Sequence, residues 1–333
     1  MKENTMKKSI QALYLASLAI LGTLAVALRA AALLTGFDFE TGYFSDKLIN
    51  NISVVITVSA AVLFLTSLIY KRDCAPRVEV GSPKDYATSA CVGTALVISA
   101  FEIFRMPIST PTASTPDVAT IITSLATLLA AVAAFYFFFS ILLGRTSPKI
   151  GAAFSMVLML YLALYAMMLY FDKQSAINAP VKLCDQMAYL ALAIFFASET
   201  RVHLARPLWR LYIASGLLAV LLSAYSSIPA LIVYFVRGEI VSHTISESVL
   251  TLSLFAFCLV RIISAITADD DRESRVVAMV KKMHGERVKA IEAAAATRAQ
   301  YNNNEENESE ESPNYEIELP DASKSDTEER TDA

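Results

Sequence analysis

Histidine is rare in this chain, which has only three in 333 residues. His203, His243 and His284 belong to three separate segments, so the histidines predict no metal cluster. The four cysteines show no paired spacing of the kind that indicates a disulfide framework or a zinc site. Three of them lie in apolar stretches, where a buried thiol behaves as a small apolar group. We therefore expect neither a metal nor another cofactor.

Motifs of common enzyme classes are missing as well. The sequence has no glycine-rich phosphate loop and no H-E-x-x-H zinc pair, and it has no serine in a G-x-S-x-G turn. Arg206 and Pro207 match part of a membrane phosphatase motif, but the Ser-Gly-His element and the downstream histidine are missing. No basic patch with interleaved aromatic residues indicates nucleic-acid binding. We therefore predict a protein that is not an enzyme and binds no nucleic acid.

Apolar residues, in contrast, make up 55% of the chain and form long stretches. A stretch of about 18 or more apolar residues is typical of a membrane-spanning helix, because a helix satisfies its own backbone hydrogen bonds in lipid. The segments of a membrane β-barrel are shorter, at about 10 residues, and alternate in polarity. The prediction is an all-α polytopic transmembrane helical bundle in contact with the lipid bilayer. Its eight spans are Ser9–Leu34, Asn51–Tyr70, Thr88–Met106, Ala119–Leu143, Gly151–Phe171, Val181–Ser198, Leu208–Phe235 and Thr244–Thr267.

Lysine and arginine are distributed unevenly among the segments that flank these spans. The N-terminus and the segments 71–84, 145–149 and 201–210 are rich in these residues, whereas the remaining segments between spans hold only Lys47, Lys173 and Arg237. Cytoplasmic segments carry the excess of positive charge in membrane proteins. We therefore predict a protein of the cell membrane with both termini in the cytoplasm.

The N-terminus allows a second interpretation. Residues 1–32 have a basic start, an apolar centre and small residues at the end, as a cleaved signal peptide has. The apolar stretch is long for a signal peptide, and Arg29 interrupts it before the cleavage site. We expect the first span to be retained, since cleavage would leave seven spans with the same topology for the rest.

The composition changes after Thr267. Residues 268–333 contain 18 acidic and 9 basic residues, which leaves 14 acidic and 19 basic residues in the first 267. Residues 268–300 are rich in helix formers and predict a juxtamembrane amphipathic helix, on the membrane surface or against a partner. Residues 301–333 are acidic and nearly lack large apolar side chains, which predicts disorder. We expect three parts, 1–267, 268–300 and 301–333, with a basic cytoplasmic protein as the partner of the acidic tail.

Ionisable residues inside the spans are the candidates for function, because they are costly in hydrocarbon. At about 1.5 Å per residue, Arg29 lies roughly 30 Å from Ser9, near the outer surface, and several other charged residues lie at a similar depth. Arg261 is placed near the inner end, where we expect its side chain to extend to the interface. The candidate outer polar layer consists of Arg29, Glu102, Arg105, Lys182, Asp185, Gln186, Tyr189 and Glu247.

Two interpretations of this outer polar layer remain open. Glu102 with Arg105, and Lys182 with Asp185, are i,i+3 pairs on their helices, so the layer can be a neutral network that holds the helices together. It can also be an outward-open pocket for a small polar ligand. The predicted function is a non-enzymatic scaffold or sensor, whose outer polar layer can bind a ligand and whose acidic tail recruits a partner. The alternative is a secondary transporter of a small polar solute that uses the layer as its outer gate. The predicted midplane holds no ionisable residue of the kind that proton relays and ion pumps need.

The first outer loop, Thr35–Asn50, contains four aromatic residues that we expect to anchor it at the membrane interface. Together with the cytoplasmic stretch Ser198–Tyr212, this loop resembles uncharacterised multi-pass membrane proteins of Gram-positive anaerobes. The resemblance rests on these two segments and implies no activity. The expected anchors are Phe37, Phe39, Tyr43 and Phe44.

Overall fold

The structure is a computed structural model. It describes residues 2–39, 41–69, 83–105, 118–143, 148–171, 179–204, 208–241, 244–267 and 283–296. Nearly all of them are helical, which confirms the all-α prediction. The helices of the first compact unit, Met1–Lys281, are α1 (Lys2–Gly36), α2 (Lys47–Leu65), the 3-10 helix η1 (Thr66–Leu68), α3 (Pro83–Arg105), α4 (Val118–Leu143), α5 (Pro148–Phe171), α6 (Pro180–His203), α7 (Trp209–Arg237) and α8 (Ile245–Thr267).

The second unit is Lys282–Ala333. Its described residues, 283–296, form one helix within the predicted juxtamembrane segment. The rest of that segment and the predicted acidic tail, 301–333, lie outside the described residues.

Six of the described helices are long and apolar enough to cross a membrane, namely α1, α2 with η1, α5, α6, α7 and α8. The chain is thus a multi-pass membrane protein that contacts the lipid bilayer. The apolar stretches described in α3 and α4 are shorter, at Tyr86–Glu102 and Ser124–Phe138.

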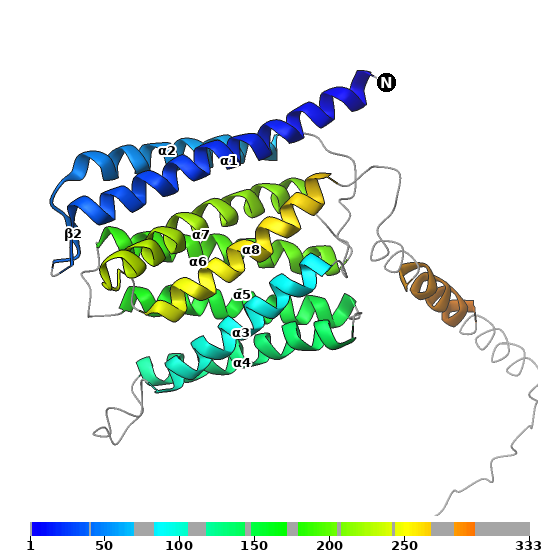
Figure 1. Cartoon of the computed structure of the whole chain (residues 1–333). Coiled ribbons are helices and arrows are strands. Elements are labelled where there is room, and N and C mark those ends of the chain that lie inside the picture. Colours follow the sequence, from blue (N-terminus) through cyan, green and yellow to red (C-terminus); the bar gives the residue numbers. More distant parts are fainter. Residues whose placement is uncertain are drawn as a thin grey trace, which may run out of the picture. The chain divides into compact units, whose positions relative to one another are not determined.

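Helix α7 is the most buried of the six and packs against α1, α2, α6 and α8 (Figure 1). Small residues on α7, including Gly216 and Ala219, allow close approach of its neighbours, as is usual between membrane helices. Among the remaining helices, α3 contacts α4 and α8, and α5 contacts α4 and α6. Most fully buried side chains belong to one continuous apolar core between these helices.

Helix α6 differs from its prediction at its C-terminal end. It begins with Pro180 at the first helical turn, where proline is tolerated because no backbone donor is needed there. It continues to His203, five residues beyond the predicted end of the span at Ser198. Glu199 and His203 therefore lie on a buried helical turn, where we had predicted a cytoplasmic loop.

The first outer loop also differs from its prediction. A short antiparallel hairpin forms from β1 (Phe37–Asp38) and β2 (Tyr43–Phe44), with Phe37 opposite Phe44. Gly42 adopts φ 74° in the turn, a left-handed conformation that glycine tolerates best. Phe44 is buried, so it does not anchor the loop at the interface as predicted.

Candidate functional site

The side chain of Arg29 occupies an enclosed site near the C-terminal end of α1. Its Nη1 donates a hydrogen bond of 2.6 Å to Oδ1 of Asn50 on α2. Its guanidinium lies over the rings of Phe44 and Tyr225, at 5.2 and 5.3 Å from the ring centroids. Tyr225 accepts a 3.1 Å hydrogen bond from Ser53 of α2. Arg29 thereby joins α1, α2, β2 and α7 through one buried cation.

The polar stripe of α6 faces neighbouring helices. Lys182, Asp185 and Tyr189 are buried, and Gln186 is half-buried. Asp185 accepts a 2.5 Å hydrogen bond from Ser226, which lies on α7 three residues before Pro229, a proline inside this helix. The stripe thus contacts protein, in agreement with the rule that intramembrane charges avoid lipid.

A second polar group joins α5, α6 and α8, and we call it the tyrosine cluster. Its members are Tyr161, Tyr165, Tyr189, Glu247 and Thr251. Tyr165 donates a hydrogen bond to Glu247, and Thr251 donates one of 3.1 Å to the Tyr189 hydroxyl. The ring centroids of Tyr165 and Tyr189 are 4.9 Å apart.

Helix α3 reaches the same region. Ser246 donates a hydrogen bond to Glu102, and Ser99 shares a 2.9 Å hydrogen bond with Tyr161. The side chain of Arg105, the predicted partner of Glu102, lies outside what the structure describes. Asp185 of the α6 stripe interacts electrostatically with Arg29 and with Tyr189, so this stripe lies between the Arg29 site and the tyrosine cluster.

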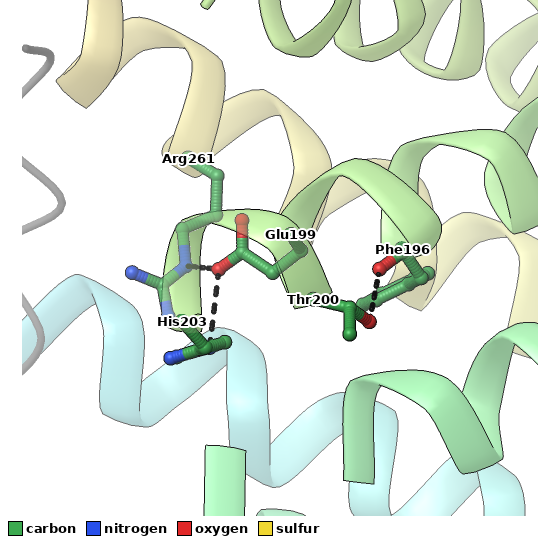
Figure 2. Close-up of polar contacts among 5 residues, drawn as sticks. All are labelled: Phe196, Glu199, Thr200, His203 and Arg261. Carbon is green, nitrogen blue, oxygen red and sulfur yellow. Dashed lines mark hydrogen bonds and ion pairs between the residues drawn. The ribbon is translucent and has the colours of Figure 1, made fainter. Parts of the chain in front are cut away.

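The C-terminal ends of α6 and α8, which the sequence predicts to face the cytoplasm, hold a charged cluster that the sequence did not predict as a site. Glu199 and His203 come from α6 and Arg261 from α8, and all three side chains are less than one-tenth exposed. Figure 2 shows dashed lines from one carboxylate oxygen of Glu199 to both of the other groups. Its Oε1 is 3.8 Å from His203 Nε2 and 3.8 Å from Arg261 Nε. We call these three residues the inner cluster.

The prediction that the Arg261 side chain extends to the membrane interface is wrong. In the structure this side chain is buried beside Glu199. Its guanidinium also lies over the ring of Phe257, at 5.2 Å from the centroid. Burial of this cation beside an anion is favoured because an isolated charge in an apolar interior is far more costly. The i,i+4 spacing of Glu199 and His203 indicates that the two side chains lie on one face of a helix. The predicted span ends at Ser198, so the sequence analysis assigned both residues to a loop.

Two further helices enclose the inner cluster. The backbone of α5 approaches so closely at Gly151 that a Cβ there would lie 2.8 Å from the His203 ring. The hydroxyl of Tyr212, on α7, is fully buried, as are both oxygens of Glu199. The Tyr212 hydroxyl and the Glu199 carboxylate interact electrostatically.

Apolar residues separate the inner cluster from the outer polar groups, and we call them the apolar layer. Tyr189 and Glu199 are ten positions apart on α6, and Thr251 and Arg261 are ten positions apart on α8, each corresponding to about 15 Å. The rings of Phe196 and Phe257 stack across this interval with their centroids 5.8 Å apart. The apolar layer consists of Leu192, Phe195, Phe196, Leu254, Phe257 and Cys258, all nearly inaccessible to solvent.

Within the described part of the chain, no three histidine, cysteine or acidic side chains are arranged to hold a metal ion. Cys91, Cys184 and Cys258 are free thiols. Comparisons with protein-family models, with curated proteins and with solved structures give no match.

Proposed function

We propose that this chain is a protein of the cell membrane that acts as a non-enzymatic scaffold or sensor, with an acidic cytoplasmic tail that recruits a basic protein. The observation that carries the proposal is the apolar layer, which is about 15 Å deep on both α6 and α8. A scaffold or sensor needs no polar path through the bundle. A transporter does, because its substrate site lies near the midplane and opens to each side in turn.

The proposal includes eight membrane crossings with both termini in the cytoplasm. Helices α3 and α4 have 23 and 26 residues, and about 20 residues suffice for the hydrocarbon of a bilayer. The lysine and arginine bias supports this orientation. A reporter that is active only in the cytoplasm should be active when fused at Arg77 or Arg206 and inactive when fused at Lys47 or Arg237. The reverse pattern would reject the topology.

Two changes to the acidic tail, a deletion and a neutralisation of its charge, test recruitment without altering the bundle. Deletion of residues 301–333 should abolish capture of a basic cytoplasmic partner by the purified protein, while the thermal unfolding of the bundle stays unchanged. A matched variant replaces the glutamates at 305, 306, 308, 310 and 311 with glutamine. This variant should also lose the partner, since the proposed recognition is electrostatic. Capture by both variants at the wild-type level would reject recruitment by the tail.

A secondary transporter of a small polar solute is the second candidate. It is favoured by the burial of Arg29, Lys182 and Asp185 in the outer half of the bundle, where charged groups are potential ligand contacts. Proteoliposomes containing the protein should then accumulate a polar solute, and Asp185→Asn should lower the uptake at least tenfold without lowering thermal stability. Uptake would not require the tail, so the tail deletion separates the two candidates.

A further inference from the structure

We infer that Glu199, His203 and Arg261 form a proton-binding site at the inner end of the bundle. The inference rests on the proposed sensor function and names the stimulus as the cytoplasmic proton concentration. Histidine is the side chain whose charge ordinarily changes near neutral pH. His203 lies in the last turn of α6, on the side that the charge bias of the sequence assigns to the cytoplasm.

The geometry makes the two basic groups compete for one acceptor atom. His203 Nε2 and Arg261 Nε lie at the same distance, 3.8 Å, from the same oxygen, Oε1 of Glu199. With a neutral imidazole, the three groups carry one positive and one negative charge. With a protonated imidazole they carry two positive charges and one negative charge, so Glu199 is shared and its attraction for Arg261 is weakened.

The residues around His203 restrict the movement of its side chain. The α5 backbone at Gly151 lies against the imidazole ring, which restricts movement of the ring away from Glu199. Among the residues that the structure describes, Tyr212 of α7 and Cys258 of α8 also interact electrostatically with Glu199 and Arg261. Both are ordinarily neutral at physiological pH, so neither supplies an anion that would balance the added proton.

Helix α8 is the element whose packing changes when His203 binds a proton. Arg261 lies six residues before the end of α8 at Thr267, and the chain then enters the charged segment that leads to the tail. Weakening of the contact between Glu199 and Arg261 loosens the inner end of α8 from α6. A proton bound at His203 thereby changes the element that joins the bundle to its cytoplasmic segment.

The intrinsic fluorescence of the protein can be used to test the inference. Its single tryptophan, Trp209, packs against Tyr212 with the ring centroids 5.9 Å apart, beside the inner cluster. The fluorescence of the full-length protein in lipid nanodiscs is titrated between pH 5 and pH 8. We expect one sigmoidal transition in the wild type and none in His203→Gln. The matched control His284→Gln, which alters a histidine of the second unit, should keep the transition.

Two further variants test the direction of the effect. Glu199→Gln removes the anion that favours imidazolium and should move the midpoint to lower pH by about one unit, whereas Arg261→Gln removes a competing cation and should move it to higher pH. A flat wild-type titration, a transition that persists in His203→Gln, or midpoints that move in the opposite directions would overturn the inference. Both shifts remain measurable if His203→Gln does not fold.

The same titration on the chain without residues 301–333 separates this inference from the proposed function. The transition depends only on the bundle, so it should be unchanged by the deletion. A normal titration combined with failed recruitment by the tail would leave the proton site standing and reject the scaffold. A transition that disappears with the tail would overturn the proton site.

Discussion

Glu199 on α6 and Arg261 on α8 face each other across the helix interface, with 3.8 Å between Oε1 and Nε and with both side chains almost completely buried. The residues are far apart in the sequence, and the guanidinium of Arg261 also lies over the Phe257 ring. The contribution of this contact to the free energy of unfolding can be measured separately from any effect on signalling.

Loss of one partner of this pair should be more harmful than loss of both. Glu199→Gln leaves Arg261 as a buried cation without its anion, and we expect a loss of about 3 to 5 kcal/mol in the free energy of unfolding. The double variant Glu199→Gln, Arg261→Met removes both charges and should recover most of this loss. Thermal unfolding in detergent measures the difference, with the exposed Glu239→Gln as control. Equal losses in the single and double variants would contradict the prediction.

Gly216 is required for the close packing of α7 against α8. A Cβ at this position would lie 2.0 Å from Cδ1 and 2.4 Å from Cγ1 of Ile262. Gly216→Ala should therefore lower the free energy of unfolding by about 1 to 3 kcal/mol through overpacking. The matched control is Gly22→Ala on α1, where the nearest atom to the added methyl group, Cδ1 of Leu221, is 3.8 Å away. Wild-type thermal stability in Gly216→Ala would show that α7 and α8 are less closely packed.

The Arg29 site should distinguish arginine from lysine. The planar guanidinium contacts Phe44, Tyr225 and Asn50 at once, and an ammonium group cannot reproduce this geometry. Arg29→Lys should cost about 1 to 2 kcal/mol of stability. The control Arg237→Lys alters an exposed arginine that donates to a backbone carbonyl, and it should leave the melting temperature within error. The prediction fails if the two variants melt together.

Tyr165 supplies the hydrogen bond that Glu247 accepts inside the tyrosine cluster. Tyr165→Phe keeps the ring contact with Tyr189 but removes the donor, so a buried carboxyl group loses a partner. The expected loss is about 1 to 3 kcal/mol. Tyr170→Phe, which alters a tyrosine of the same helix that is 52% exposed, provides the comparison in thermal unfolding. A smaller loss in Tyr165→Phe than in Tyr170→Phe would show that the hydroxyl contributes nothing to stability.

The sequence by itself determined the helical architecture. Residues such as those of α5 and α7 are apolar over lengths that match a bilayer, and in lipid a helix is the local solution for the backbone. Both helices agree with their predicted spans to within three residues. The end of α6 was missed because Glu199 and His203 are polar, and polar residues in sequence indicate a loop unless a partner on another helix is known.

Only the tertiary structure decided which polar groups meet. The sequence placed these polar groups at one depth without their partners; in the structure Arg29 contacts α2 and α7, Glu247 contacts α5, and Asp185 interacts with both Arg29 and Tyr189. The inner cluster depends on how α6 and α8 are rotated about their own axes and on the close approach of α5 at Gly151. Backbone hydrogen bonds of a helix form between residues four apart, so local sequence specifies them. Contacts between helices form between residues far apart in the chain, and the packing of the whole bundle specifies them.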